Sequence, residues 1–389
     1  MDLKLELVTR LKAGERMAEL CREFGIARKT GYLVLKRYEA SGAAGLFAES
    51  RAPKSTPHKT PPAVVDLIIG ARRRHPTWGP KKLKASLEAE LGHSLPASST
   101  IGDMLDRAGL VERRRRRRLY TPTPTRLRDV TAPNDTWCVD YKGQFRLGDD
   151  SLCYPLTVTD QFSRCILGCD GMAAISDADA RDAFVTIFKA NGLPSVMRSD
   201  NGVPFASVGL AGLTKLSVYW LRLGIVLERI RKGHPEDNGR HERMHRTLKR
   251  ETTRPARTNL LQQQESFDAF VDEFNRERPH EAIDMRKPAD VYRPSLRAHP
   301  ASLPELRYPA HDDVLTVNTR GWIYPPGRGQ IYLATALATQ DVGIREGDDG
   351  RWLVTFATID LGHVEPDRTF TPMPTGPAVP PEVLPMLPV

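Results

Sequence analysis

The sequence contains no apolar run of 18 residues, so a transmembrane helix is excluded. Its amphipathic N-terminus also lacks the apolar core of a signal peptide. Five cysteines are present, but they form no CxxC pair and show no His/Cys zinc spacing. An odd number of thiols without a disulfide framework indicates buried, reduced side chains, so we expect a cytoplasmic protein with no membrane partner.

The charge of the chain is unevenly distributed. The first 130 residues carry 27 basic and 14 acidic side chains, a net charge of +13, whereas the remainder carries 30 and 34, a net charge of −4. A basic N-terminal third on a nearly neutral body is expected to bind a polyanion, most simply nucleic acid. Solvated surface charge, the ordinary explanation, would not be expected to segregate in this way.

The first 50 residues have the pattern of three short helices, with a turn at Gly25 before a basic third helix. This order predicts a helix-turn-helix DNA-binding domain over residues 1–50, whose third helix enters the major groove. We expect the first residues of that helix, Arg28, Lys29 and Thr30, to contact DNA. An ordinary small helical bundle is the alternative. Because the first helix follows the initial methionine so closely, we also expect residues upstream of it.

A second helical domain is predicted over residues 62–112, again with a helix-turn-helix layout, and Ser98 or Ser99 should cap its last helix. A basic linker follows over residues 113–130. Six adjacent like charges cannot pack against one another, so we expect an exposed tether that contacts DNA phosphates, with a flexible spacer as the alternative. The run consists of Arg113, Arg114, Arg115, Arg116, Arg117 and Arg118.

The remaining sequence predicts two further domains and a tail. Three strand-like runs followed by alternating helices and strands indicate an α/β domain with a mixed sheet over residues 131–295. Short strand patterns with a GDDGR turn predict a small β-barrel over residues 309–370. Residues 371–389 are rich in proline and are expected to form a tail without regular structure.

Three acidic residues carry the predicted chemistry. Asp140 lies in an apolar strand, Asp200 follows another, and Glu242 lies near the start of a helix. A carboxylate buried in an apolar strand is costly without a partner, and two divalent metal ions would supply one. Arg246 and Lys249 share the helix face of Glu242, where substrate phosphates would lie. This arrangement predicts an enzyme that cuts and joins DNA.

The same motifs resemble those of bacterial insertion-sequence transposases with a retroviral-integrase-type catalytic core. The four motifs are W-x-x-D, S-D-N-G, N-G-x-x-E-R-x-H-R-x-L-K and N-x-x-R-P-H-x-A. The step of 42 residues from Asp200 to Glu242 is longer than is common in the family, and the extra residues fall in SVGLAGLTK. The matching residues are Trp137 and Asp140; Ser199, Asp200, Asn201 and Gly202; Asn238, Gly239, Glu242, Arg243, His245, Arg246, Leu248 and Lys249; and Asn275, Arg278, Pro279, His280 and Ala282.

The resemblance implies an RNase H-like fold for residues 131–295 and a DDE polynucleotidyl transferase activity. Asp140, Asp200 and Glu242 would then bind two Mg²⁺ ions, for which Mn²⁺ can substitute. The enzyme would bind the terminal inverted repeats of a mobile element, nick its 3′ ends and transfer them into target DNA. It would act as a dimer or tetramer on double-stranded DNA, associated with the bacterial nucleoid.

Two other functions are compatible with parts of the sequence. Residues 241–245 spell H-E-x-x-H, which on a helix could bind zinc with Glu242 as the general base of a protease. Arg243 inside the motif is unusual for such enzymes, and a protease would leave Asp140 and Asp200 unexplained, so we do not favour it. A transposase-derived regulator that binds DNA without cutting it is the second alternative, and the presence of all three carboxylates argues against it.

Overall fold

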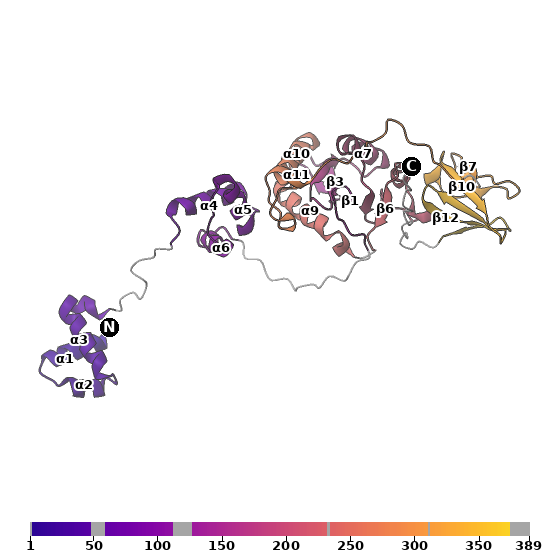
Figure 1. Ribbon diagram of the computed structural model, residues 1–389. Helices are drawn as coiled ribbons and strands as arrows, with labels where there is room; N and C mark the ends of the chain where they lie inside the picture. Colours follow the sequence, from indigo (N-terminus) through magenta and orange to yellow (C-terminus); the bar gives the residue numbers. More distant parts are fainter. Residues whose placement is uncertain (1, 48–58, 112–126, 232–233, 310–311, 374–389) are drawn as a thin grey trace, which may run out of the picture. The chain divides into compact units, whose positions relative to one another are not determined.

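The computed structural model describes residues 2–47, 59–111, 127–231, 234–309 and 312–373. The chain divides into two compact units, Met1–Pro62 and Ala63–Val389 (Figure 1). The basic run 113–118 and nearly all of the proline-rich tail lie outside the described residues.

The first unit contains the three expected helices around a small apolar core. They are α1 (Asp2–Lys12), α2 (Met17–Glu23) and α3 (Arg28–Ser41), followed by the 3-10 turn η1 (Gly42–Leu46). Gly25 has a φ of 63°, a left-handed conformation that glycine adopts without strain, and it makes the turn between α2 and α3. A Cβ at Gly31 would lie 2.7 Å from the sulfur atoms of Cys21 and Met17, so glycine lets α3 approach α2 closely.

The second helical region is α4 (Pro62–Arg74), α5 (Pro80–Leu91) and α6 (Ser98–Arg107). Trp78, which is buried, stacks on His75 with ring centroids 4.0 Å apart. The expected cap of α6 is wrong: Ala97 occupies the N-cap position, with no side-chain hydrogen bond, because the helix already includes Ser98 and Ser99. Proline at the first position of α5 fits the helix start, where its missing N–H has no intrahelical partner.

The central α/β region is built on the expected mixed sheet. Its strand order is β2-β3-β1-β5-β6, and β4 pairs with β3 at a branch of this order. The pairs of β3 with β1 and β4 are antiparallel, whereas β1, β5 and β6 are parallel. The strands are β1 (Thr136–Tyr141), β2 (Phe145–Arg146), β3 (Leu152–Asp160), β4 (Ile166–Met172), β5 (Val196–Ser199) and β6 (Val226–Arg229).

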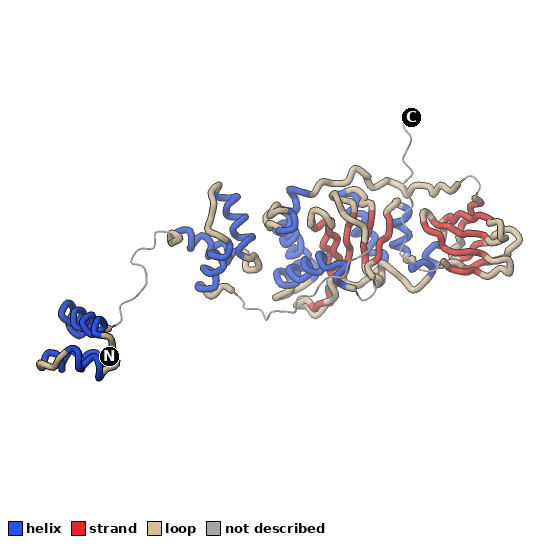
Figure 2. Tube along the Cα trace, turned by 60° about the horizontal axis from the view of Figure 1, so that its bottom comes forward, coloured by secondary structure: helices blue, strands red, loops and turns tan. Residues whose placement is uncertain are grey.

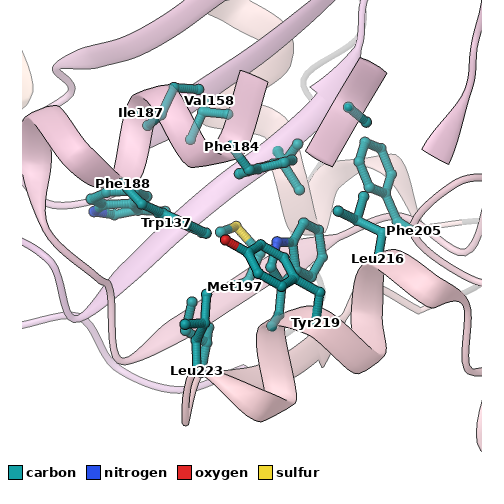
Figure 3. Close-up of a cluster of buried hydrophobic side chains, with 14 of the residues drawn as sticks. Trp137, Val158, Phe184, Ile187, Phe188, Met197, Phe205, Leu216, Tyr219 and Leu223 are labelled. Atoms are coloured by element: carbon teal, nitrogen blue, oxygen red, sulfur yellow. The ribbon is translucent and has the colours of Figure 1, made fainter. Parts of the chain in front are cut away.

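Helices cover both faces of this sheet, as Figure 2 shows in blue around the red strands. On one face, α7 and α8 bury Phe184 and Tyr219 in a cluster with Trp137 of β1 and Val158 of β3 (Figure 3). On the other face, α9 and α10 form an apolar cluster with β3 and β4 that includes Leu248. The helices of this region are α7 (Asp177–Asn191), α8 (Lys215–Arg222), α9 (Gly239–Thr252), α10 (Leu260–Arg276) and α11 (Pro288–Val291), with short 3-10 turns η2 (Leu210–Gly212), η3 (Pro235–Asn238) and η4 (Glu281–Ile283).

The alternation of side chains along β1 decides which face receives its carboxylate. Trp137 and Val139 belong to the cluster under α7 and α8. Successive strand residues point to opposite faces, so Cys138 and Asp140 face α9. In agreement, the Asp140 carboxylate lies 3.6 Å from His245 of α9. The apolar side of the strand therefore directs the acidic side chain towards the helix that carries Glu242.

The C-terminal region is rich in β-structure, but the expected closed barrel is not confirmed. Among the described strands the sheet order is β13-β12-β11-β10-β7, and its two edge strands do not pair with each other. Its apolar face packs against Val218 and Leu221 of α8, so the sheet is covered without closing on itself. The elements are β7 (Asp313–Thr316), β8 (Trp322–Ile323), β9 (Ile331–Tyr332), η5 (Thr335–Leu337), β10 (Asp341–Glu346), β11 (Trp352–Phe356), β12 (Ile359–Val364) and β13 (Phe370–Pro372).

None of the helices in the described ranges is long and apolar enough to cross a membrane, in agreement with the sequence.

We expect Phe184→Ala to lower the free energy of unfolding by about 3–5 kcal/mol, because it opens a cavity in a fully buried cluster. Phe184 contacts Trp220 edge to face, with centroids 4.9 Å apart, so that contact is lost as well. Urea unfolding would measure the change, with Thr186→Ala on the exposed side of α7 as the control. Equal effects of the two substitutions would contradict this packing.

Candidate active site

Asp140 and Asp200 are brought together by two neighbouring parallel strands. In the register of β1 with β5, Thr136 lies opposite Val196 and Cys138 lies opposite Arg198. Extended by two residues, the same register places Asp140 opposite Asp200, the residue that directly follows β5. Neighbouring strands lie about 4.8 Å apart, so the two carboxylates share one edge of the sheet.

The electrostatics of Asp140 agree with this geometry. Burial, followed by the negative charge of Asp200 and more weakly that of Glu242, raises the pKa of Asp140 to about 7, although Lys142 acts in the opposite direction. The side chain is 24% exposed, so solvent screens part of these interactions. The like charges close to Asp140 are what a bound cation would relieve, and hard divalent cations such as Mg²⁺ prefer carboxylate oxygens.

Glu242 lies in the first turn of α9, on the exposed side of the helix. The opposite side is buried through Met244 and Leu248, which pack against the sheet. Arg246 and Lys249 are exposed, one and two turns after Glu242. The helix thus presents a carboxylate and two cations to solvent on one side.

The three carboxylates do not form a closed metal site in this structure. In the part of the chain that the structure describes, no three His, Cys, Asp or Glu side chains lie close enough together to hold a metal ion. Asp200 accepts a hydrogen bond from the backbone N–H of Gly202 at 3.0 Å, which orients its carboxylate within the turn after β5. The assignment of Asp140, Asp200 and Glu242 as ligands therefore stays a prediction.

A buried hydrogen-bond network joins α9 to β3 beside Asp140. The Thr157 hydroxyl lies 2.7 Å from Nε2 of His241 and 2.6 Å from Nε2 of His245, and it donates to the Asp140 carbonyl at 3.0 Å. The Thr159 hydroxyl lies 2.8 Å from Nδ1 of His241. One proton and two lone pairs satisfy all three partners of Thr157 if both imidazoles donate from Nε2. This network, which the sequence analysis missed, attaches the helix of Glu242 to the strands that hold Asp140.

The same network removes the structural basis for a zinc protease. Both Nε2 atoms of the H-E-x-x-H histidines are directed to the hydroxyl of Thr157, and the two rings meet edge to face at 4.6 Å. Burial lowers the pKa of His241 to about 3 and also lowers that of His245, so both imidazoles are neutral. His245 contacts neighbouring side chains rather than solvent. One sequence signal could have predicted this network. It combines threonines at alternate positions of a strand with two histidines four residues apart on a helix.

The other acidic residue in β3, Asp160, belongs to a turn. Its carboxylate accepts hydrogen bonds from the backbone N–H and hydroxyl of Ser163 at 2.7 and 2.6 Å, and from the N–H of Asn134 at 2.8 Å. These hydrogen bonds hold the Asp160 carboxylate at the end of β3, away from the carboxylates of the candidate site.

The predicted DNA-contact residues of the first unit are all exposed. Arg28 begins α3, and Lys29 and Thr30 follow it in the first turn, where a recognition helix would meet DNA. The arginine run 113–118 lies outside the described residues.

Comparison with known families agrees with this architecture. The family described as "Integrase core domain" matches residues 130–235 and, in a second form, residues 223–288. Together the two matches cover residues 130–288. A family described as "Helix-turn-helix domain" matches residues 3–54, and a "Homeodomain-like domain" matches residues 30–105. The resemblance inferred from the motifs is thereby confirmed, and the integrase core spans all three predicted carboxylates.

Two curated relatives carry names from mobile elements. The chain is 28% identical over 165 residues to the "Transposase for insertion sequence element IS904" of Lactococcus lactis subsp. lactis, a match that covers 41% of this chain and 62% of that protein. It is 27% identical over 229 residues to an insertion element IS407 uncharacterized 31.7 kDa protein of Burkholderia multivorans, covering 58% of this chain and 78% of the relative. The chain thus spans less than two thirds of the Lactococcus protein.

Retroviral integrases are among the solved structures to which the chain is similar. The HTLV-2 integrase catalytic core domain in complex with magnesium has a TM-score of 0.34 at 14% identity, covering 42% of this chain and 98% of that one. The simian T-cell lymphotropic virus intasome in complex with PP2A regulatory subunit B56 gamma has a TM-score of 0.38 at 14% identity, covering 73% and 99%.

We expect Thr157→Val to lower the free energy of unfolding by about 2–4 kcal/mol, because it leaves two buried imidazole N–H groups without an acceptor. Thr157→Ser keeps the hydroxyl and loses one methyl group, so it should cost only about 1 kcal/mol. Chemical denaturation of the two variants measures the difference. If the serine and valine variants are equally destabilised, the hydroxyl of Thr157 does not hold α9 against β3.

We expect Asp140→Asn to stabilise the metal-free protein at pH 8, by on the order of 2 kcal/mol, because it removes a partly buried charge. The folded-state pKa of Asp140 is raised to about 7, above its ordinary value of 3.8. Its ionisation therefore destabilises the fold fully above pH 7, less as the pH falls, and not at all below about pH 4. The gain should accordingly shrink between pH 8 and pH 5.

Thermal unfolding with EDTA at both pH values tests this expectation. Asp182→Asn, which removes an exposed charge from α7, is the control. A stability gain that does not depend on pH would show that the Asp140 carboxylate is not the group responsible.

Proposed function

We propose that the protein is a DNA transposase that binds the terminal inverted repeats of a mobile element and joins the ends of that element to target DNA. The observation that carries the proposal is the pair of aspartates on adjacent parallel strands, with a glutamate on the helix packed above them. The integrase core family match and the transposase name of a curated relative support the same reaction class.

In this proposal Asp140, Asp200 and Glu242 hold two Mg²⁺ ions, for which Mn²⁺ can substitute. The ions would supply charge neutralisation and activation of the attacking oxygen at the scissile phosphate. The fit rests on the donor chemistry, because carboxylate oxygens suit Mg²⁺. Burial and the neighbouring charge of Asp200 both raise the pKa of Asp140, and a bound cation would oppose both effects. Gly202 and the Thr157 network hold the two aspartate segments in orientation.

The reaction has two steps of the same kind. Water attacks a phosphodiester at the end of the element, which breaks the P–O bond and leaves a 3′-OH. That 3′-OH then attacks a phosphodiester of the target, so one bond forms as another breaks and no covalent bond to the protein is needed. The contribution of the protein is positioning and electrostatic stabilisation. Arg246 and Lys249, exposed beside Glu242, would bind the phosphates on either side.

DNA recognition is assigned to the N-terminal helices. Arg28, Lys29 and Thr30 at the start of α3 would read the terminal repeat, and the second helical region and the run 113–118 would extend the contact along the backbone. Joining two ends requires two active sites on one DNA complex, so the protein would act as a dimer or tetramer in the bacterial cytoplasm, on nucleoid DNA. The C-terminal sheet would bind flanking DNA or another subunit.

We expect Asp200→Asn and Glu242→Gln each to lower strand transfer at least about 100-fold, a loss of roughly 3 kcal/mol of transition-state stabilisation, while DNA binding is retained. The assay combines each protein with labelled DNA carrying the element's ends and Mg²⁺, and reads nicked and joined products on a gel. The exposed Asp182→Asn variant serves as the charge-matched control.

Each other result has a distinct meaning. A wild-type protein that binds the ends but never cuts them in Mg²⁺ or Mn²⁺ would favour the regulator alternative. Cutting that persists in Asp200→Asn would show that Asp200 is not a ligand.

A further inference from the structure

A large hollow lies along α9 beside the candidate active site. Its volume is about 730 Å³, and none of the three proposed metal ligands lines it. The α9 residues that line it include Arg240, Arg243, Thr247 and Arg250, spaced three or four apart along one side of the helix. Glu242 does not line the hollow, but Arg246, four residues later on the same face of the helix, does, so the hollow adjoins the candidate site along α9.

We propose that this hollow, the α9 arginine cleft, is a second DNA-binding site that holds the phosphodiester backbone next to the scissile position. The cleft is defined by Arg164, Arg240, Arg243, Arg246, Arg250 and Arg278. The inference rests on the proposed function for the identity of the DNA, but not for the existence of an anion site.

The acidic residues that line the cleft do not pair with Arg240 or Arg243. Two acidic side chains, Asp160 and Glu281, line it. The Asp160 carboxylate is buried and accepts its hydrogen bonds from the turn at Ser163. Glu281 pairs with Lys81 at 2.8 Å. An excess of positive charge therefore remains on the wall of the cleft.

Three of the arginines that line the cleft, Arg164, Arg240 and Arg243, lie close enough to influence one another electrostatically. The pKa of Arg164 is lowered to about 10, first by burial and then by the positive charges of Arg240 and Arg243. Burial, and then Arg198, likewise lower the pKa of Arg240. Arg243 donates to the backbone carbonyl of Gly239 at 3.3 Å, and within the described ranges no carboxylate pairs with Arg240 or Arg243. Guanidinium groups gathered in this way repel one another until an anion lies between them.

The far wall of the cleft is formed by the N-x-x-R-P-H-x-A motif, which the carboxylate chemistry leaves unused. Asn275 holds this segment against β4 through two hydrogen bonds to Ile166, at 2.9 and 2.8 Å. Arg278 is fixed by Glu251 at 3.0 Å and lies over the Phe274 ring. His280 lines the cleft, and its Nε2 atom is buried without a hydrogen-bond partner among the described groups.

The dimensions favour DNA over a single small anion. From Arg240 to Arg250 the helix advances about 15 Å, at 1.5 Å per residue. One DNA strand carries a phosphate every 3.4 Å or so along the duplex axis, so this length corresponds to about four phosphates. Guanidinium groups bind phosphates through paired N–H donors, which suits repeated backbone contact without base recognition.

Salt-dependent binding separates the cleft from the rest of the DNA surface. We expect Arg240→Ala/Arg243→Ala to weaken duplex binding on the order of tenfold and to lower the slope of log K against log salt by about 2, since each lost phosphate contact removes about 0.9. Fluorescence anisotropy of the full chain in EDTA measures both quantities without DNA cleavage. The double variant Arg276→Ala/Arg307→Ala removes the same charge from exposed positions outside the cleft. Equal changes in the two double variants would overturn the proposal.

Disulfide trapping places the DNA directly. All five native cysteines are buried, so an introduced surface thiol is the reactive one. Thr247→Cys in the cleft should form a covalent product with a duplex that carries a thiol tether on a backbone phosphate, whereas the exposed Thr186→Cys on α7 should not. One duplex carries the element's terminal sequence and a second has an unrelated sequence, so the trapped partner distinguishes element ends from target DNA.

Failure of the cleft and failure of the proposed function give different results. Wild-type protein that joins DNA, combined with no trapping at Thr247, overturns the cleft alone. Trapping at Thr247 by a protein that never cuts DNA supports the cleft and rejects the transposase.

Discussion

Parallel pairing between β1 and β5 determines where the charged groups of the candidate site lie. The register of the two strands brings Asp140 level with Asp200, and the apolar residues on the other side of β1 hold that strand against α7 and α8. Two carboxylates at this spacing repel each other, and burial makes the repulsion stronger, as the raised pKa of Asp140 records. Hydrophobic packing of the core thus stabilises an acidic pair that the local electrostatics oppose.

The attachment of α9 to the sheet combines apolar and polar contacts. Met244 and Leu248 pack α9 against the sheet. His241 and His245, on the same helix, both hydrogen-bond to the hydroxyl of Thr157. Apolar packing alone would tolerate small shifts of the helix along the sheet. A fully satisfied buried network does not, because any shift leaves a polar group unpaired. The position of Glu242 therefore depends on a threonine of β3 as much as on its own helix.

Much of the fold could be predicted from local sequence patterns, because short-range rules govern helices and strands. The second helical domain is expected from residue 62, and α4 begins at Pro62, while α5 begins at Pro80, because proline suits the first position of a helix. The cap of α6 was mispredicted because serine inside the first turn looks the same in sequence as serine before it. The barrel is predicted from the strand patterns alone. Those patterns cannot predict that α8 packs on the C-terminal sheet and covers its apolar face.

The candidate site was predictable to a different degree. The motifs around Asp140, Asp200 and Glu242 are local, so the sequence indicates them directly. The histidine network joins residues 84 and 88 positions apart, and the arginine cleft gathers side chains from β3, α9 and the segment after α10. Contacts between residues so far apart in the sequence depend on which elements pack together, and periodic sequence patterns do not predict them.

The first unit carries its own apolar core, made of Leu7, Val8, Leu20, Val34 and Leu46, all of which precede residue 48. Substitutions on the outer surface of α3 can therefore accumulate without disturbing the sheet that bears the carboxylates. If α3 recognises DNA as proposed, its sequence preference could change during evolution while the proposed active site stays the same.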